Sequence, residues 1–274
     1  MKNQVIKVKQ DMTHLSWTKI RNSSGTAGSF LKAFSDIGGA KTYYKLSNYD
    51  PYKGIIGHEC MNEIIVDRLL TILGIEHLSY QLIYADVVVD DTLFETYLCA
   101  SDDFKKKGEN KIALDAFYQV ERKEGEKPLD FCIRMGWESY VYEMLVVDFL
   151  ILNRDRHGAN IEVLKDAKKK SFRLAPLFDH GLSLVFPCQS EEDVAKLDVM
   201  EDKPVQCFVG SRSVKDNLEL IPHKKRPKIQ VLKETDKEIL FKDLEDVLPN
   251  AFQEKIWEMI WKRWKYYEDF CYQR

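Results

Sequence analysis

Two short polar clusters within residues 150–182 constrain this chain more than any other feature of its sequence. The first, residues 153–160, reads NRDRHGAN and follows an apolar segment whose large residues recur at helical spacing. The second, residues 178–181, reads FDHG and follows an extended apolar segment in which Pro176 fixes the backbone near the strand end. Polar residues at the ends of apolar elements lie at the rim of a core, where a cleft can open. We therefore predict that both clusters border a cleft.

The spacing inside the first cluster indicates a chemistry. Asp155 and Asn160 have four residues between them. Phosphoryl transfer requires a carboxylate that faces the acceptor hydroxyl and an oxygen ligand for Mg²⁺ nearby, and protein kinases carry these groups as an Asp and an Asn at this spacing. A second metal-binding Asp follows on the next hairpin, ahead of a Gly that lets the chain turn. The segment Asp179-His180-Gly181 has this form.

Two oxygen donors from the protein are sufficient to bind Mg²⁺ in such a site. Mg²⁺ favours hard oxygen ligands and recruits few from the protein, because phosphates and waters fill its other positions. Asn160 and Asp179 would be enough. The alternative for the Asp-to-Asn spacing alone is a surface loop in which the Asp caps a turn. The strand and Asp-x-Gly segment that follow favour the phosphoryl-transfer interpretation.

The N-terminal part of the chain offers a phosphate loop and a lysine. Residues 23–29 form a small-residue turn, and Gly25 and Gly28 would let backbone N–H groups approach phosphates. A second turn follows, and then a strand over 41–46 whose Lys45 could reach the α- and β-phosphates as a point charge. The alternative is a plain hairpin with its lysine at the surface.

The next apolar pattern predicts a helix over 57–74. Its large aliphatic residues form one face, and Gly74 is a typical stop. Glu63 lies beside that face, and in a kinase fold such a helix presents a glutamate to the strand lysine. Glu59 is a rival for this role, and a solvated helix charge is the alternative for both.

Two hairpins frame these elements. Turn residues at 36–39 and at 90–91 predict one hairpin before the lysine strand and another over 78–104. Adenine would be held by backbone groups of an extended linker between two lobes. The segment 99–103 is the best-placed linker, and it contains Ala100, Ser101 and Asp102.

The C-terminal half reads mainly as helix. We predict a helix over 137–152, a hairpin turn over 165–170 and a final helix that starts at Pro249. The charge-rich stretches 105–111 and 121–127 are expected to be solvated loops or faces. The final helix carries large apolar residues at spacings of three and four, which is typical of core packing: Trp257, Ile260, Trp261 and Trp264.

Composition excludes several classes of protein. The length of 274 residues suits one large domain or two modest lobes, and 45% apolar with 31% charged residues is ordinary for a soluble globular protein. The net charge of −3 argues against bulk nucleic-acid binding. Six scattered cysteines without a Cys-x-x-Cys motif favour reduced thiols in the cytoplasm. We expect no signal peptide and no membrane span.

Taken in order, these segments make the chain similar to the HipA-like serine/threonine kinases, particularly the short forms without the extra N-terminal subdomain. The resemblance covers about residues 23–187. Its most specific parts are Asn153-x-Asp155-Arg156-His157-x-x-Asn160 and Leu174-x-Pro176-Leu177-Phe178-Asp179. Its supporting parts are Tyr44-Lys45-Leu46 and Asn62-Glu63 with Gly74, a spacing that favours Glu63 over Glu59.

The resemblance implies an α+β bilobal protein-kinase-like fold, with a β-rich N-lobe over 1–104 and a mainly helical C-lobe over 105–274. It implies ATP with Mg²⁺, a Ser/Thr acceptor on a protein and, for many members, an antitoxin-like regulator or a host-directed effector role. Autophosphorylation of a loop serine (Ser23, Ser24 or Ser29) is also implied. By resemblance, Asp155 is the catalytic base, Asn160 and Asp179 hold metal, Lys45 contacts phosphates, 99–103 is the hinge, and His157 and Phe178 line the nucleotide site.

Two departures and two alternatives remain. The phosphate loop lacks the Gln-Lys element of larger members, and the segment after residue 187 does not match the family. The Asp-Arg-His-x-x-Asn string also resembles phosphoinositide kinases, so the acceptor could be a lipid or small molecule. A catalytically silent nucleotide-binding protein that acts on a partner is the third hypothesis, against which the complete set of Lys45, Asp155, Asn160 and Asp179 argues.

Overall fold

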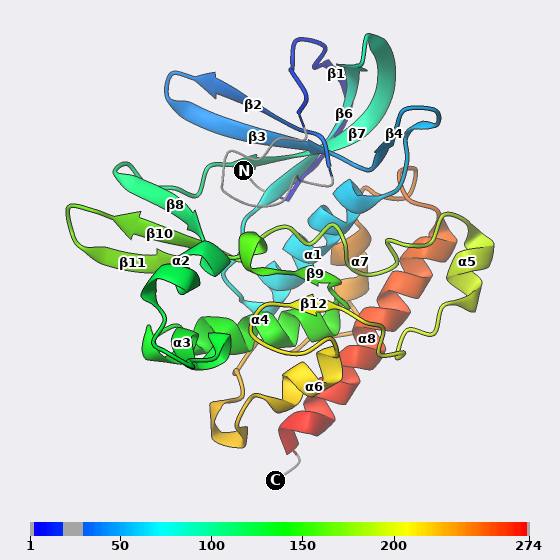
Figure 1. Cartoon of the computed structure of the whole chain (residues 1–274). Helices are drawn as coiled ribbons and strands as arrows, with labels where there is room; N and C mark the ends of the chain where they lie inside the picture. The colour runs from blue at the N-terminus through cyan, green and yellow to red at the C-terminus, as the bar shows by residue number, and fades with distance from the viewer. Residues whose placement is uncertain (1–2, 19–29, 273–274) are drawn as a thin grey trace.

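A five-stranded sheet forms the upper part of the molecule (Figure 1). The computed structural model describes residues 3–18 and 30–272 of the 274-residue chain. The strand order is β1-β6-β7-β3-β2, in which β1 runs parallel to β6 and the other neighbours are antiparallel. The strands are β1 (Val5–Asp11), β2 (Lys32–Ile37), β3 (Ala40–Leu46), β6 (Tyr80–Val89) and β7 (Thr92–Asp102).

Two connections in this sheet are two-residue turns with a left-handed backbone. Asp90 and Asp91 join β6 to β7 with φ of 48° and 62°, and Gly38 and Gly39 join β2 to β3 with φ of 63° and 85°. Such turns match the right-handed twist of the flanking strands, and Gly, Asn and Asp tolerate them best. Both hairpins predicted from the sequence are therefore confirmed.

Helix α1 (Glu59–Leu73) lies beneath the sheet and joins it to the helical part. The helix predicted over 57–74 is confirmed, and Gly74 ends it with φ of 72° while its N–H donates to the carbonyls of Leu70 and Thr71. Leu82 and Cys99 of the sheet belong to the same buried cluster as α1 and the lower helices. The opposite face of the sheet has a separate core that includes Leu46, Ile83, Val87 and Leu98.

The lower part is mainly helical, and α4 packs against α8 in its centre (Figure 1). The predicted helix over 137–152 is α4, and α8 follows Pro249 as predicted. Ile260 and Trp264 are buried, and Trp257 and Trp261 pack on the same core at its edge. The helices are α2 (Leu114–Glu121), α3 (Pro128–Arg134), α4 (Glu138–Leu150), α5 (Glu191–Lys196), α6 (Val214–Glu219), α7 (Asp236–Phe241) and α8 (Asn250–Tyr272), with short 3₁₀ turns at Gly158–Asn160 and His223–Lys225.

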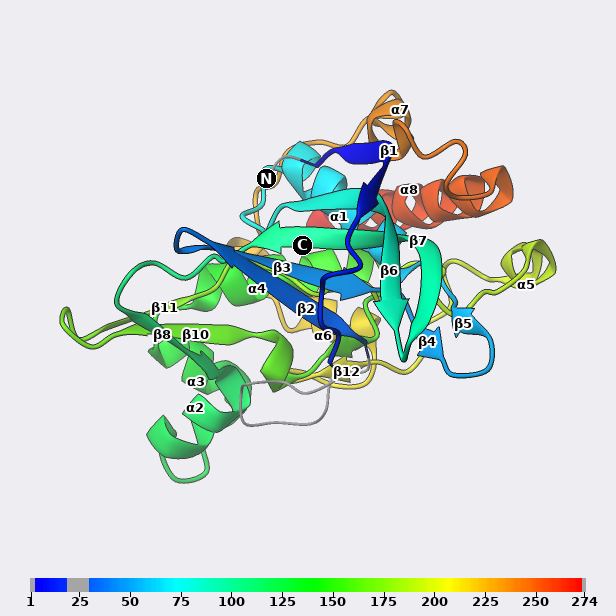
Figure 2. The ribbon, with the colours of Figure 1, turned by 90° about the horizontal axis from the view of Figure 1, so that it is seen from above.

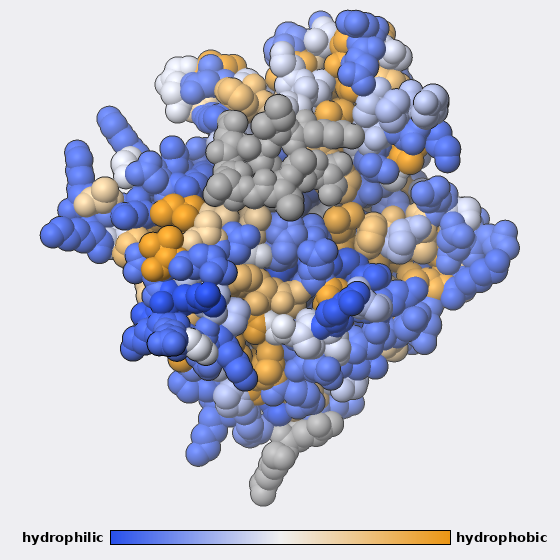
Figure 3. Space-filling view, viewed as in Figure 1, coloured by the Kyte–Doolittle hydropathy of each residue, from blue (hydrophilic) through white to orange (hydrophobic). Residues whose placement is uncertain are grey.

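A three-stranded antiparallel sheet, in the order β11-β10-β8, projects from one side of the molecule, opposite α5 (Figure 2). It comprises β8 (Glu109–Ala113), β10 (Glu162–Asp166) and β11 (Ser171–Leu174), and the exposed, hydrophilic turn between β10 and β11 forms a tip (Figure 3). The segment 105–111, predicted to be a solvated loop or face, ends in a strand. Residues from Glu109 onward pair with β10, because that strand would otherwise present unpaired backbone groups on one edge.

Smaller pairings complete the structure. A short strand β9 (Asp155–Arg156) in the first polar cluster pairs in parallel with β12 (Gln206–Cys207). The hairpin β4 (Tyr49–Asp50) and β5 (Gly54–Ile55) leads into α1. The predicted fold class is confirmed, since a β-rich part lies above a mainly helical part (Figure 1). Within the described ranges, no helix combines the length and apolar character needed to cross a membrane.

His77 connects α1 to the strand segment that leads to Asp179. Its Nε2 lies 2.8 Å from Asp67 Oδ1 and its Nδ1 lies 2.7 Å from the carbonyl of Ile75. Both partners are acceptors, so the doubly protonated imidazolium satisfies this environment best. The next residue, Leu78, donates its N–H to the carbonyl of Leu177 at 2.8 Å. The histidine therefore fixes the turn against which the second polar cluster is placed.

We expect His77→Gln to destabilise the protein more at pH 6 than at pH 9. Burial alone favours the neutral ring, but the hydrogen bond with Asp67 raises the pKa of His77 above its ordinary value. A raised pKa contributes stability that is complete below the unfolded-state value of about 6.5 and is lost as pH rises through the folded-state value. Urea unfolding at both pH values measures the difference. His14→Gln, at an exposed position, is the control, and an equal loss at both pH values for His77→Gln would contradict the interpretation.

Candidate active site

A cavity of about 660 Å³ opens between the five-stranded sheet and the two polar clusters. Strands β2, β3 and β7 form its upper wall, and α1 and the start of β6 form its back. The ends of the two polar clusters form its floor. Several of its lining residues can bind or polarise an anion or a cation, among them Lys32, Lys45, Glu63, Tyr80, Asn160 and Asp179.

Lys45 lies between two carboxylates at the back of this cavity. Its Nζ is 2.8 Å from Glu63 Oε1 and 2.6 Å from Asp179 Oδ1. Burial alone would lower the pKa of the Lys45 ammonium, but Asp179 and Glu63 outweigh it and raise that pKa well above its ordinary value. The lysine is therefore held charged, at a position where an approaching phosphate would meet a fixed cation.

Glu63 also holds the second polar cluster. Its two carboxylate oxygens accept the backbone N–H groups of His180 at 2.9 Å and of Gly181 at 3.1 Å. The rival, Glu59, instead accepts the N–H of Asn48 at 3.2 Å, and burial raises the pKa of its carboxyl. The structure thus assigns the lysine pair to Glu63, the residue that the sequence favoured, and gives Glu59 a role in the loop before α1.

The second cluster has a left-handed residue at Asp179, just before the turn that begins at Gly181. Asp179 has φ of 59°, a left-handed backbone that few residues other than glycine adopt. Space at Gly181 is tight, because a Cβ there would lie 3.1 Å from Lys45 Nζ and 3.2 Å from Glu59 Cβ, and these neighbours would have to shift slightly. Gly181 lies in the turn that follows, as the sequence predicted, and its lack of a side chain also lets the chain pass close to the lysine and α1.

Asp155 is fixed by its neighbours in the first cluster. Its backbone N–H donates to Asn153 Oδ1 at 3.2 Å, and Asn160 Nδ2 donates to its carbonyl at 2.8 Å and to its Oδ2 at 3.2 Å. His157 Nε2 lies 3.6 Å from Asp155 Oδ1, and its Nδ1 accepts the N–H of Ala159. His157 does not line the cavity, contrary to prediction, because capping this turn directs its ring toward Asp155. The Asp155 side chain is 23% exposed, so an acceptor can reach it.

The donors present fit Mg²⁺. Asn160 and Asp179 both line the cavity and offer carboxamide and carboxylate oxygens, the ligand types that this cation prefers. Because Asn160 directs its Nδ2 toward Asp155, its Oδ1 is turned away from that residue. Asp179 is already bonded to Lys45 through Oδ1. Among the described residues, no group of three His, Cys, Asp or Glu side chains could enclose a metal by itself. Phosphates and waters would have to complete the coordination.

Aromatic side chains line the opposite end of the cavity. The rings of Phe104 and Phe178 lie 5.6 Å apart between centroids, and Lys111 Nζ lies 4.1 Å above Phe104 and 4.9 Å from Tyr43. All four residues line the cavity. A flat apolar surface of this kind suits a nucleobase, and Phe178 is the residue that the sequence placed there.

Most of the segment predicted as the linker lies in a strand. Residues 99–102 of the predicted 99–103 belong to β7, where Ala100 and Ser101 pair with β3 on one side and β6 on the other. Of the predicted contacts, Ser101 lines the cavity, whereas Ala100 packs in the core on the far face and Asp102 does not line it. The chain leaves the sheet at 103–108. The sequence pattern could not show this, because an apolar strand end and an extended linker look alike.

The predicted phosphate loop lies outside the described residues, which resume at residue 30. Lys32, at the start of β2, places its Nζ 3.7 Å from Asp179 Oδ2. Nothing in the sequence distinguishes this lysine from the many others in the chain. The predicted loop residues that lie outside the described ranges are Gly25 and Gly28, with Ser23, Ser24 and Ser29.

Tyr80 is a site residue that sequence reasoning missed. Its hydroxyl accepts the N–H of Asp179 at 3.3 Å, and burial, followed by the nearby Glu63 and Asp179 carboxylates, raises the pKa of its phenol. The alternation of Tyr80, Leu82 and Tyr84 predicts a strand but not which side chains face a cavity. Only the packing of α1 against the sheet decides that.

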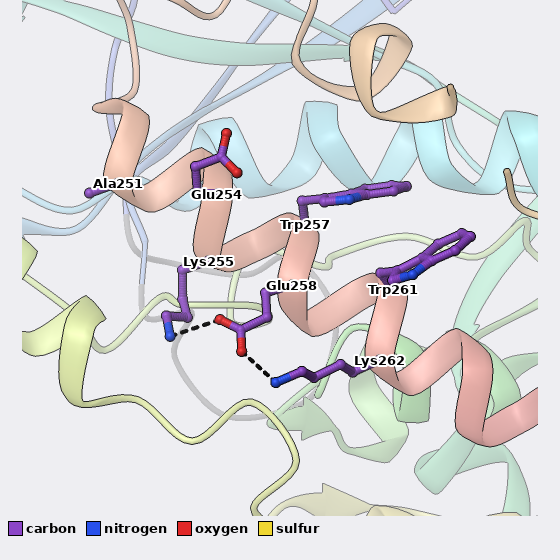
Figure 4. A pocket seen from close by; sticks show the side chains of 7 residues that line it. All are labelled: Ala251, Glu254, Lys255, Trp257, Glu258, Trp261 and Lys262. Atoms are coloured by element: carbon purple, nitrogen blue, oxygen red, sulfur yellow. Dashed lines mark hydrogen bonds and ion pairs between the residues drawn. The ribbon is translucent and has the colours of Figure 1, made fainter. Parts of the chain in front are cut away.

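A second hollow, along α8, lacks the arrangement of groups that phosphoryl transfer requires. Its walls come from a single helix, and Glu258 pairs with Lys255 and Lys262 across it (Figure 4). The rings of Trp257 and Trp261 stack with their centroids 5.4 Å apart and point away from these ion pairs (Figure 4). Charges that neutralise each other beside packed tryptophans stabilise a helix surface and leave no polar group directed at a reacting atom.

The comparison with solved structures supports the fold. The crystal structure of the Helicobacter pylori proinflammatory kinase CtkA matches with a TM-score of 0.62 and 14% sequence identity, over 93% of each chain. The fold is that of a kinase. A structure described as WaaP in complex with acyl carrier protein matches at a TM-score of 0.39 and 15% identity, over 86% of this chain and 87% of that one, too low a score to support an inference. No protein-family profile matches this kinase-fold chain, and neither does any curated protein sequence.

We expect Glu63→Gln to lower the free energy of unfolding by about 1.5–3 kcal/mol, the range for a hydrogen bond to a charged group. The change leaves Lys45 with Asp179 alone and weakens the acceptor of two backbone N–H groups. Glu59→Gln is the matched control, because Glu59 is also buried and lies one helical turn earlier. It should cost less, since the acceptor on Lys45 Nζ from this helix is Glu63. Urea unfolding monitored by circular dichroism measures both. Equal losses would show that the ion pair has no special role.

Proposed function

We propose that this protein is an ATP-dependent protein kinase that phosphorylates serine or threonine hydroxyls. One observation carries the proposal: Lys45 and Asp179, which are 134 residues apart in sequence, meet in one cavity together with Asn160, beside Asp155. A binding module has no need for all four groups. Their positions suit phosphoryl transfer, in which positioning and charge stabilisation supply most of the catalysis.

The proposed reaction uses each group once. The acceptor hydroxyl oxygen forms a bond to the γ-phosphorus while the bond from that phosphorus to the β–γ bridging oxygen breaks, and ADP leaves. Asp155 orients the hydroxyl and takes its proton. Lys45 neutralises charge on the phosphates. When bound, Mg²⁺ would be held by Asn160 and Asp179 and would neutralise the phosphates between them.

The proposed kinase family and division into lobes rest on the sequence motifs. We propose membership of the HipA-like kinases from the segments around Asp155 and Asp179, with 1–104 and 105–274 acting as two lobes. A toxin or effector role, an antitoxin-like partner and autophosphorylation of a loop serine follow from that proposal. Cytoplasmic action is supported by the cysteines, all six of which are free thiols.

We expect Asp155→Asn to lose phosphoryl transfer by about 10²–10⁴-fold while it keeps its fold and its affinity for ATP. The amide can still accept the bond from Asn160, but it cannot take a proton. Purified protein is incubated with Mg²⁺-ATP, and intact mass spectrometry measures the phosphate gained. Radiolabelled ATP with mixed protein or inositol-lipid acceptors then identifies the acceptor class.

Asp166→Asn serves as the control, because this carboxylate caps the turn at the far end of β10 and should leave transfer unchanged. Full activity in Asp155→Asn would remove the proposed mechanism. Label on lipid alone would replace the protein acceptor by a lipid. Tight ATP binding without transfer to any acceptor would favour a silent nucleotide-binding protein.

A further inference from the structure

A buried ion pair lies directly beneath the first polar cluster. Asp148, near the end of α4, faces Arg156, whose Nη2 lies 2.9 Å from Asp148 Oδ1 and whose Nε lies 3.0 Å from Oδ2. The guanidinium is 1% exposed and the aspartate side chain 7%. A buried ion pair gains little stability over apolar side chains of the same volume, so stability alone does not explain it.

The other side of the same guanidinium holds the two segments that carry the proposed metal ligands. Arg156 Nη1 donates to the carbonyl of Asn160 at 3.3 Å and to the carbonyl of Phe178, the residue before Asp179, at 3.0 Å. A guanidinium has five N–H donors in a rigid plane, whereas a lysine has donors at a single point. One planar group therefore fixes the catalytic loop and the Asp179 segment relative to α4.

Asn153 extends this network to Asp155. Its Nδ2 donates to Asp148 Oδ1 at 2.8 Å, and its Oδ1 accepts the N–H of Asp155 at 3.2 Å. Its own N–H donates to the carbonyl of Asp148 at 3.0 Å. The side chain of Asp148 is thus linked to Asp155 through Asn153. It is linked to Asn160 and Phe178 through Arg156.

We propose that Asp148 is a positioning residue, which sets the distance between the Asp155 carboxylate and the Asn160–Asp179 oxygen donors through Arg156 and Asn153. This inference rests on the proposed phosphoryl transfer for its effect on rate. Its physical basis is general, because a shift of about 1 Å in a reacting group can cost about 10²-fold in rate. None of Asp148, Asn153 and Arg156 lines the cavity, so these three residues act on the reaction only through the backbone they hold.

The test is Asp148→Asn, which keeps the shape and one acceptor oxygen but removes the charge that orients Arg156. We expect kcat to fall by about 10²-fold, with KM for ATP changed by less than threefold, since the nucleotide-binding walls remain. Arg156→Lys is the second variant, used also if the first fails to fold. It keeps the positive charge but cannot reach a carboxylate and two carbonyls in separate directions, so it should reproduce the same kinetic pattern.

The matched control is Arg68→Lys. Arg68 is also a buried arginine and donates to the carbonyls of Leu240 and Lys242, but it joins α1 to α7 and does not touch the cluster. Arg68→Lys should lower the free energy of unfolding but leave kcat unchanged at temperatures below the thermal unfolding transition of this variant. Loss of kcat in Arg68→Lys equal to that in Asp148→Asn would overturn the positioning role and leave a general effect of stability.

Amide hydrogen exchange, measured without nucleotide, separates this inference from the proposed function. We expect Asp148→Asn to speed exchange about tenfold or more in both 153–160 and 177–181, with α8 unchanged. If the wild type transfers no phosphate while exchange changes in this pattern, the proposed function fails and the positioning network stands. Exchange unchanged in both segments, or increased equally throughout the chain, would overturn the network whatever the activity.

Discussion

The ammonium group of Lys45 can remain charged in the interior only because two carboxylates lie against it. One, Glu63, comes from α1, and the other, Asp179, comes from the second polar cluster, so a single cation joins the sheet, the helix and the floor of the cavity. Removing two carboxylates and an ammonium group from water costs free energy, and their short mutual contacts must offset that cost. Here the carboxylate of Glu63 also accepts two backbone N–H groups, which ties its position to the chain it orients.

A second cluster of buried charged groups also fixes the backbone of the site, from its other side. Asp148 and Arg156 do not face the cavity, yet they hold the backbone on which Asp155, Asn160 and Asp179 stand. The two clusters meet at residues 178–181, where Glu63 binds the N–H groups after Asp179 and Arg156 binds the carbonyl before it. This explains how Asp179 can keep a left-handed backbone with φ of 59°, because its neighbours on both sides are fixed by charged groups.

The sequence predicted the elements that have strong local signals. Helix α1 combines an apolar face with a glycine stop, and the β6–β7 hairpin has a turn of two aspartates, so both were predictable from neighbouring residues alone. The linker after β7 and the strand β8 were not, because nothing local distinguishes a strand end from an extended loop. Strand β8 forms where a charged segment meets the open edge of β10, which is a long-range pairing. Tyr80 and Lys32 were missed for the same reason, since facing a cavity is a property of packing.

The sequence by itself determined which chemical groups the chain possesses and their order: a lysine on a strand, a glutamate on the following helix, and an Asp, an Asn and a second Asp on two short clusters. Residue type and spacing are local, and the motifs they form carry the family resemblance that implied the kinase-like fold class. Only the tertiary structure decided that these groups meet, which of two glutamates pairs with Lys45, and how little space a side chain at Gly181 would have. Distances between residues far apart in sequence depend on how whole elements pack, and the buried charges fix them because an unpaired charge could not stay in the core.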